Sequence, residues 1–365
     1  MPETETEIRH HAESFLATPE QQPAWPPRLE QEIASRQEVI TIPMTGTDAM
    51  LADWRALLQL SLDDNPFMSP AFLIPAASHL AKNDGLSLAV IWEHTNGIRR
   101  LVGLFALMPA TRNRATGWLS ANRAVLWHHP LQAFCAPLLA GPEPLAQRTM
   151  QTFLDWLSAR RPRMARLETM AMPVDGHATR LLEAEATRRG LVIEHRRERA
   201  HTHGLDFKPK LASADLKAIT IATAPGDVRR ALERLLCLDA EEHGTDVRSS
   251  ILGYPDHATF IRAAVRSFSL ENRIMIALLD RADARAGAII LEGRDKAYLW
   301  WTMGPSASDP RIEAALAAAA QKQIGKALVA AALRPLTGLG TETLVTQSLS
   351  IELAPMAHHD ETAQK

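Results

Sequence analysis

The chain has 365 residues, of which 46% are hydrophobic. This length exceeds the ~250–300 residues at which a single hydrophobic core usually stops growing. We therefore expect two domains. Forty Lys and Arg residues stand against 42 Asp and Glu residues, a formal charge of −2, so the composition favours neither nucleic acid nor an anionic membrane as a partner.

Cysteine usage and hydropathy limit the class of protein further. Cys135 and Cys237 are far apart and lack C-x-x-C spacing, which argues against a disulfide framework and against a cysteine zinc site. We expect both to be small buried hydrophobic residues. No apolar run reaches the ~18–20 residues of a membrane span, and the first residues are acidic, unlike a signal peptide. The sequence thus predicts a cytoplasmic protein.

The first half of the chain predicts alternating strands and helices. Residues 1–36 are charged and contain several prolines, so we expect them to be disordered or loosely docked. From residue 38 on, hydrophobic periodicity predicts ordered structure. The expected order is strand 38–44, helix 49–62, helix 70–82, strands 86–92, 98–107 and 124–128, helix 145–159, strand 166–172, helix 177–189 and strand 191–195.

The second half repeats this order. It predicts strand 216–223, helix 227–238, a polar loop 241–250, helix 256–269, an antiparallel meander of strands 273–279, 285–292 and 296–303, and helix 311–324. Val90 and Val102 are 12 residues apart, as are Ile276 and Ala288 in the corresponding strands. The repeat predicts an internal duplication. The expected fold class is therefore α/β (α+β), with domains at 37–207 and 208–355, each a mixed, mostly antiparallel sheet flanked by helices, and a flexible tail at 356–365.

A loop of small residues, 304–310 (GPSASDP), precedes the last predicted helix. Unpaired N–H groups at a helix start can receive a phosphate, and Ser306, Ser308 and Arg311 offer two hydroxyls and a charge there. The same stretch also fits an ordinary helix cap, with Asp309 as the capping residue and Pro310 at the first helical position. Asp309 would repel a phosphate. The sequence leaves both interpretations open.

Short sequence matches spread over residues 38–324 resemble a known family. They include Trp54–Leu57, Asn65-Pro66-Phe67, Ser69–Phe72, Leu101-Val102-Gly103, Trp127-His128, Pro137–Leu139, Leu181-Leu182 and Arg189-Gly190. With them the chain resembles the CelD-like branch of the GNAT acetyltransferase superfamily, also described as cellulose-biosynthesis-associated or BioF2-like proteins. The resemblance implies tandem GNAT folds, acetyl-CoA or another acyl-CoA as co-substrate, no metal, and acyl transfer to an amine or hydroxyl of a small molecule or sugar, in polysaccharide synthesis.

The resemblance also assigns roles to particular residues. In such enzymes the acyl-CoA pyrophosphate rests on a helix start, and the acceptor enters a cleft between splayed strands. The expected catalytic residues are His243 as general base, Glu242 as an alternative base and Tyr298 as proton donor to the leaving thiolate. Asp239 and Glu241 also lie beside His243, and any one of these carboxylates could be the base or bind an amine. Ser306, Ser308 and Arg311 are the expected cofactor-binding residues. The expected substrate-binding residues are Asp246, Arg248, Trp300, Asn65 and Phe67.

Each of these residues also has an ordinary structural interpretation. A loop histidine is commonly a solvated polar group, the acidic residues beside it fit a charged helix end, and strand aromatics pack in cores. Strand alternation places Tyr298 and Trp300 on one face and Leu299 and Trp301 on the other. His128 and His129 would point to opposite faces of a strand, so we do not expect them to chelate a metal.

Two other functions remain open. Neither half contains the Arg/Gln-x-x-Gly-x-Gly/Ala loop of ordinary GNAT enzymes, which favours a catalytically degenerate scaffold of polysaccharide or envelope synthesis. A Fem-type aminoacyl transferase would need a basic surface for tRNA, which the composition does not indicate. The expected partner is a small-molecule or sugar acceptor, without nucleic acid and without a membrane span, and the sequence leaves the oligomeric state open.

Overall fold

The computed structural model describes residues 35–81, 85–108, 123–160, 164–197, 217–246, 248–330, 342–343 and 345–353. The predicted boundary at residues 207 and 208, the tail 356–365 and nearly all of the segment 1–36 lie outside these ranges. Within the described ranges, every helix is too short or too polar to cross a lipid bilayer.

The first sheet has the strand order β1-β2-β3-β4-β6-β14-β7, with β5 also paired to β3. Its strands are β1 (Arg36–Pro43), β2 (Ser87–Thr95), β3 (Ile98–Met108), β4 (Arg123–Leu126), β5 (Leu138–Leu139), β6 (Arg166–Pro173), β7 (Ile193–Arg197) and β14 (Thr346–Glu352). Its helices are α1 (Leu51–Leu60), α2 (Pro70–His79), α3 (Glu143–Ala159) and α4 (His177–Arg188). The β4–β6 pair is parallel and the other pairs are antiparallel.

The second sheet has the order β13-β12-β11-β10-β9-β8. Its strands are β8 (Ile219–Ala222), β9 (Ile274–Asp280), β10 (Arg285–Glu292), β11 (Lys296–Met303), β12 (Ala327–Ala330) and β13 (Glu342–Thr343). Its helices are α6 (Pro225–His243), α7 (Pro255–Leu270) and α8 (Pro310–Ile324). β11–β12 and β12–β13 are parallel pairs, and β8 to β11 form an antiparallel meander.

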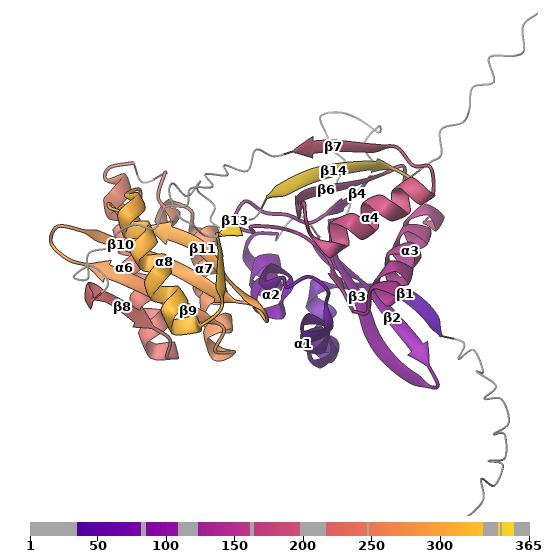
Figure 1. Ribbon diagram of the computed structural model, residues 1–365, viewed down its shortest axis with the longest axis horizontal. Helices are drawn as coiled ribbons and strands as arrows, with labels where there is room; N and C mark the ends of the chain where they lie inside the picture. The colour runs from indigo at the N-terminus through magenta and orange to yellow at the C-terminus, as the bar shows by residue number, and fades with distance from the viewer. Residues whose placement is uncertain are drawn as a thin grey trace, which may run out of the picture. The chain divides into compact units, whose positions relative to one another are not determined.

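The two halves share one order of elements (Figure 1): a strand, two helices, three antiparallel strands, a helix, and a strand parallel to the last of the three. The parallel pair is β4–β6 in the first half and β11–β12 in the second. The predicted fold class is confirmed: the chain is a mixed α/β protein with two mostly antiparallel sheets flanked by helices. The predicted helices and strands from residue 38 to residue 324 are all present, with ends shifted by a few residues.

The largest shift of a helix end is in α6. It continues to His243 instead of ending at residue 238, so the predicted loop 241–250 starts later and His243 occupies a helical turn. α6 also carries Cys237, which is exposed, so the expectation that both cysteines are buried is wrong for Cys237 and confirmed for Cys135. The amphipathic period places Leu235, Leu236 and Leu238 in the core and leaves Cys237 on the outer face.

The sequence did not predict β5, β12, β13 or β14, and β14 has the least expected place. It lies in the range assigned to the second domain but pairs between β6 and β7 of the first sheet, where Figure 1 shows it in yellow. Its burial alternates, with Leu349 and Ile351 pointing into the first core and the residues between them partly exposed. The first and last described strands, β1 and β14, therefore belong to the same sheet.

A bulge in β11 changes the faces predicted for its aromatic residues. Ile289 pairs with Trp301 and Ile290 with Leu299, so Trp300 has no partner in the ladder. An extra residue of this kind reverses the alternation beyond it. Trp301 therefore packs in the same cluster as Tyr298 and Trp300, while Leu299 faces the other side, and the predicted pairing of Leu299 with Trp301 on one face is wrong.

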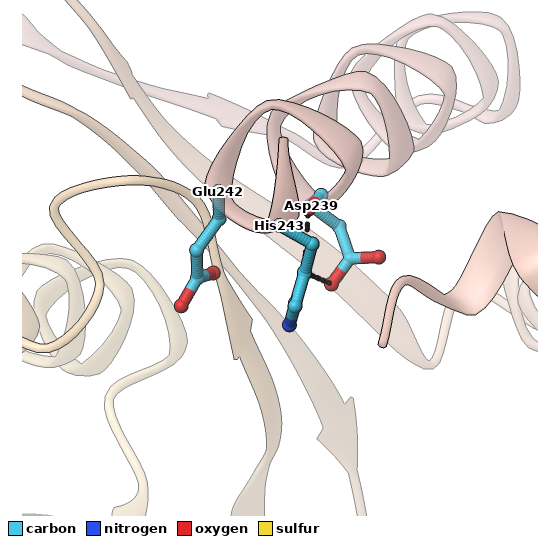
Figure 2. A group of neighbouring side chains, drawn as sticks. All are labelled: Asp239, Glu242 and His243. Atoms are coloured by element: carbon cyan, nitrogen blue, oxygen red, sulfur yellow. Dashed lines mark hydrogen bonds and ion pairs between the residues drawn. The ribbon is translucent and has the colours of Figure 1, made fainter. Parts of the chain in front are cut away.

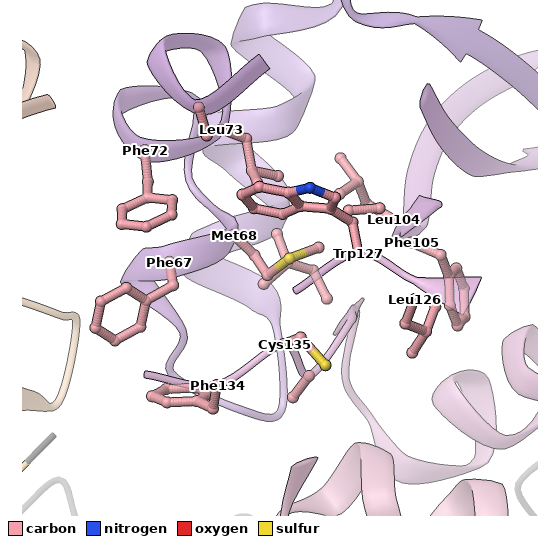
Figure 3. Close-up of a cluster of buried hydrophobic side chains, with 14 of the residues drawn as sticks. Phe67, Met68, Phe72, Leu73, Leu104, Phe105, Leu126, Trp127, Phe134 and Cys135 are labelled. Carbon is pink, nitrogen blue, oxygen red and sulfur yellow. The ribbon is translucent and has the colours of Figure 1, made fainter. Parts of the chain in front are cut away.

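The cores explain why these residue types occur on these elements. In the first half, Phe105 on β3 stacks on Phe153 of α3 with ring centroids 3.7 Å apart. Figure 3 shows the neighbouring cluster, in which side chains of α2, β3 and the segment after β4 meet around Trp127. In the second half, buried alanines of α8 pack on buried alanines of β9 and β10. Small side chains on both surfaces let helix and sheet approach closely.

The second helices of the two halves, α2 and α7, pack against each other. Phe72 of α2 and Phe260 of α7 meet edge to face at 5.2 Å, and both contact the ring of Trp300. The Trp300 indole is fully buried and donates to the carbonyl of Leu131, which follows β4. An aromatic cluster thus joins the corresponding helices of the repeat.

Two adjacent acidic residues after α1 bind backbone groups of both halves. Asp63 accepts from the N–H groups of His177 and Ala178, at 2.8 and 2.7 Å, at the start of α4. Asp64 accepts from the N–H groups of residues 294, 295 and 296 in the β10–β11 turn, at 2.9 to 3.1 Å. Arg294 in that turn donates to the carbonyls of Gln59 and Ser61. We call Asp63 and Asp64 the aspartate pair.

The aspartate pair requires a glycine at position 293. A Cβ atom there would lie 2.2 Å from a carboxylate oxygen of Asp64, so Gly293→Ala should displace Asp64 from its three backbone donors. We expect a loss of about 2–3 kcal/mol in the free energy of unfolding, because hydrogen bonds to a charged group are lost. Urea denaturation measures it, with Gly46→Ala as the control, since a Cβ there meets its nearest atom at 3.5 Å. Equal stability of the two variants would contradict the role of Asp64.

His129, after β4, should make the folded protein less stable at low pH. His129 and His257 meet edge to face at 5.3 Å, and burial, followed by the neighbouring His257 and His128, lowers the pKa of His129 from 6.5 to about 4. Its Nδ1 accepts from the N–H of Leu131, which requires a neutral ring. A lowered folded pKa means that stability is full above pH 6.5 and is lost as pH falls towards 4.

We expect His129→Gln to reduce the loss of stability between pH 6.5 and pH 4, because the variant removes one group that must take up a proton on unfolding. Thermal or urea unfolding at a series of pH values gives the slope. His257 also has a lowered pKa, caused mainly by burial, so part of the slope should remain. His195→Gln, at a half-exposed histidine, is the control. An unchanged slope in His129→Gln would contradict the assignment.

Candidate functional site

The predicted site residues fall into three places: the end of α6, the loop before α8, and the junction of the two halves. The end of α6 carries Glu242 and His243, together with Asp239 one turn earlier (Figure 2). Nδ1 of His243 lies 2.8 Å from the carbonyl oxygen of Asp239 and 3.8 Å from its carboxylate. A carbonyl only accepts, so Nδ1 carries the proton and, in the neutral ring, the lone pair is on Nε2.

Asp239, one of the carboxylates predicted to act as a base or to bind an amine, is held by buried hydrogen bonds. Its side chain is 2% exposed, and one carboxylate oxygen accepts from the hydroxyl of Ser250 at 2.8 Å and from the N–H of Ile251 at 2.7 Å. These bonds tie the end of α6 to the segment before α7. The sequence signal was the spacing of Asp239 and His243, four residues apart on one helix face.

Glu242 connects this helix end to the second sheet. Its carboxylate accepts from the N–H of Gly304, the first residue after β11, at 3.1 Å. Gly304 has φ of +117°, and a Cβ atom there would lie 2.8 Å from the carbonyl oxygen of Arg285, so only glycine fits. Glu242 and His243 thus lie beside the last residues of β11.

Asp239, Glu242 and His243 also form the group of potential metal ligands that the described residues offer. One ligand atom from each lies within 4.8 Å of the others. Both carboxylates already accept backbone N–H groups, and Nδ1 of the imidazole is bonded to the Asp239 carbonyl. These bonds fix the orientation of the three groups, as they would for a base that accepts a proton at Nε2 or for ligands of a metal ion.

Asp246 and Arg248 lie just beyond α6 and are exposed. The N–H of Asp246 donates to the carbonyl of His243 at 3.0 Å, and its carboxylate accepts from the hydroxyl of Ser249. Asp246 is thus in the turn that follows His243. Substrate-binding roles for Asp246 and Arg248 stay predictions.

The loop before α8 uses most of its own donors. The hydroxyl of Ser306 accepts from the N–H of Arg285, and the carboxylate of Asp309 accepts from the N–H of Arg311 at 2.8 Å. The N–H groups of residues 304, 306, 307, 309, 311, 312 and 313 donate within the chain. Asp309 is therefore the helix cap, one of the two interpretations that the sequence left open.

In this conformation the loop does not fit a pyrophosphate. Asp309 occupies the helix start, and Glu313 adds a second carboxylate to the first turn of α8. Ser308 and Arg311 are exposed, and Arg311 is one positive charge against two carboxylates in this segment. Cofactor-binding roles for Ser306, Ser308 and Arg311 stay predictions.

The remaining predicted residues lie at the junction of the halves. Asn65 is buried, with its amide donating to the carbonyl of Ala136 and accepting from the N–H of Phe67. The ring of Phe67 contacts those of Tyr298 and Trp300. These contacts give Asn65, Phe67 and Trp300 packing roles, and their substrate-binding roles stay predictions.

Tyr298 lies at the opposite end of β11 from Gly304. Its hydroxyl donates to the carbonyl of Asp64 at 2.5 Å. Burial, followed by the negative charges of Asp64, Asp63 and Asp295, raises the pKa of Tyr298 well above its ordinary value. The structure thus brings Glu242 and His243 together and places Tyr298 away from them.

Comparisons with known proteins complete this description. No family model and no curated protein matches the chain. Among solved structures, a tandem GNAT protein from the clavulanic acid biosynthesis pathway is 11% identical, with a TM-score of 0.38 over 88% of this chain and 99% of that one. FemX is 7% identical, with a TM-score of 0.44 over 78% and 85%. The C-terminal domain of a putative lysylphosphatidylglycerol synthetase from Agrobacterium fabrum is 12% identical, with a TM-score of 0.36 over 75% and 74%.

Asp239→Ala should destabilise the end of α6. The variant leaves the Ser250 hydroxyl and the Ile251 N–H without their buried acceptor, so we expect a loss of about 2–4 kcal/mol in the free energy of unfolding. Asp246→Ala, at an exposed position of the same region, should change stability by less than about 0.5 kcal/mol. Urea denaturation compares them. Similar stability of the two variants would show that Asp239 does not hold this site.

Proposed function

We propose that this protein is a GNAT-type acyltransferase with two tandem domains, and that the reaction takes place at the end of β11 in the second half. The proposed donor is acetyl-CoA or another acyl-CoA, and the proposed acceptor is an amine or hydroxyl of a small molecule or sugar, in polysaccharide synthesis. The repeated order of elements supports it, with a parallel strand pair, a bulged strand and a following helix in the second half.

The single observation that carries the proposal is the orientation of His243. Its Nδ1 proton is fixed on the Asp239 carbonyl, so Nε2 is the nitrogen that can accept a proton. The buried Asp239 carboxylate, 3.8 Å from the ring, stabilises the imidazolium that forms. Removal of a proton from an acceptor amine or hydroxyl as it attacks an acyl carbon needs a base of this kind.

The other predicted groups enter the proposal differently. Glu242 acts by holding Gly304, and so the end of β11, next to His243. Tyr298 is at the far end of the strand and takes no part in the proposed proton transfer. Because Asp309 caps α8, the start of this helix has no part in the proposed proton transfer.

A non-catalytic scaffold in polysaccharide or envelope synthesis is the second candidate, and two observations favour it. The start of α8 is capped by the chain itself. In the first half, the segment between β4 and β5 closes the gap beside β6, because the N–H of Cys135 donates to the carbonyl of Ala171. The start of α8 in the second half and the edge of β6 in the first half are thus already bonded to the chain itself.

Release of free thiol from acetyl-CoA, in the presence of a panel of amines, amino sugars and sugars, tests the proposed activity. His243→Ala should reduce turnover by about 10²–10⁴-fold, the usual contribution of a general base, without weakening donor binding. His195→Ala is the control, since that histidine is half-exposed and lies on β7 of the first sheet. Charged tRNA, added in place of acetyl-CoA, tests an aminoacyl donor of Fem type.

Calorimetry with acetyl-CoA tests the α8 loop. Asp309→Ser keeps a capping hydroxyl and removes a negative charge, so it should tighten binding, whereas Arg311→Glu should weaken it. Absence of both thiol release and binding for every acyl-CoA tested, in the wild type and in Asp309→Ser, would reject the enzyme in favour of the scaffold.

A further inference from the structure

A cavity of about 320 Å³ lies where the aspartate pair joins the two halves. Its wall comes from the segment after α1, the β6–α4 turn and the first residues of β11, with Val329 of β12 and Val345 before β14. It is separate from the His243 site, because Lys296 and Tyr298 begin β11 and Gly304 follows its end. The volume is within the range of small-molecule sites.

The cavity wall contains two backbone sites that would attract an anion, and both are filled. The start of α4 offers the N–H groups of His177 and Ala178, which Asp63 occupies. The β10–β11 turn offers three successive N–H groups, which Asp64 occupies. A diffusing phosphate or carboxylate would meet these two negative charges and find their donors already used.

The charged side chains on the wall are also mainly acidic. Asp63, Asp64, Asp175 and Asp295 line the cavity, and Lys296 is the ammonium among the lining residues. Two guanidinium groups lie close by: Arg294 pairs with Asp295, and Arg180 donates to the backbone carbonyl of Asp175 and to His177.

Tyr298 lines the same cavity as these carboxylates. After burial, the largest causes that raise its pKa are Asp64, Asp63 and Asp295, while Arg294 acts in the opposite direction. Three of the lining carboxylates thus act on the hydroxyl of Tyr298, and Arg294 opposes them.

Apart from the imidazole of His177 and the phenol of Tyr298, the remaining lining side chains are apolar. They are Leu62, Phe134, Pro173, Val329 and Val345. A bare metal ion would leave this surface without a partner, whereas a hydrocarbon body would cover it. We propose that the cavity binds an organic cation, a primary amine carried on a short apolar body, with the ammonium among the carboxylates and the body against Phe134 and Val329.

Three probes of matched shape test this proposal on the full chain: hexylamine, hexanol and hexanoate. Ligand-observed NMR or calorimetry should show saturable binding of hexylamine, weaker binding of hexanol and none of hexanoate. Added salt should weaken the binding of hexylamine, because charges near the surface are screened. Equal binding of hexylamine and hexanol, or preferential binding of hexanoate, would overturn the proposal.

Two variants locate the site. Asp175 is exposed on the β6–α4 turn, and Asp175→Asn should weaken hexylamine binding about fivefold, the effect of one unit charge a few ångströms away in a partly solvated site. Asp48→Asn, an exposed acid outside the cavity, is the matched control. Val329→Phe should fill the apolar side and abolish binding, and an unchanged circular dichroism spectrum would show that this variant is folded.

Unchanged hexylamine affinity in both cavity variants would place the amine elsewhere and reject the site. Binding of Mg²⁺ or Ca²⁺ that excludes hexylamine would also reject it, in favour of a metal site. The readout is binding alone, so the result does not depend on whether His243 catalyses acyl transfer.

Discussion

The contact on which this structure depends is made by two neighbouring carboxylates after α1. Asp63 holds the start of α4, and Asp64 holds the β10–β11 turn of the other sheet. Each carboxylate accepts from at least two backbone N–H groups, which are oriented by the helix and by the turn and carry a partial positive charge. Because one dipeptide serves both halves, the position of the second sheet is fixed relative to the helix that follows β6. The strand β14 returns to the first sheet and adds a covalent link between the halves.

The two halves share one order of elements but differ after β4 and within β11. In the first half, β4 ends at Leu126, and the following segment leaves the sheet before β5 resumes pairing with β3. That segment supplies the carbonyl acceptor for the Trp300 indole and closes the gap beside β6. In the second half, a single bulged residue takes the place of the whole segment. The first half therefore contributes packing groups to the junction, while the second half ends β11 beside a histidine and two acidic residues.

The two candidate sites differ in what holds them. His243 depends on Asp239, whose own bonds to Ser250 and Ile251 are buried, so the orientation of the imidazole is set by packing within one half. The cavity depends on the junction and exists because both halves contribute to its wall. Asp309 at the start of α8 acts in the same way as Asp63 and Asp64, since its carboxylate accepts from a backbone N–H group that could otherwise bind an anion.

The sequence alone determined the type of most elements between residues 38 and 324 and the repetition of their order, because hydrophobic periodicity and turn residues are local properties of the chain. It did not predict the short strands β5, β12 and β13. It also brought attention to Glu242 and His243, which the structure places together, and to Asp309 as a cap. Only the tertiary structure decided that β14 belongs to the first sheet, that Trp300 is a bulge, that Asp239 orients His243, and that Asp63 and Asp64 join the halves. Each of these depends on groups far apart in the sequence, and strand pairing over such distances leaves no local pattern that a single sequence can show.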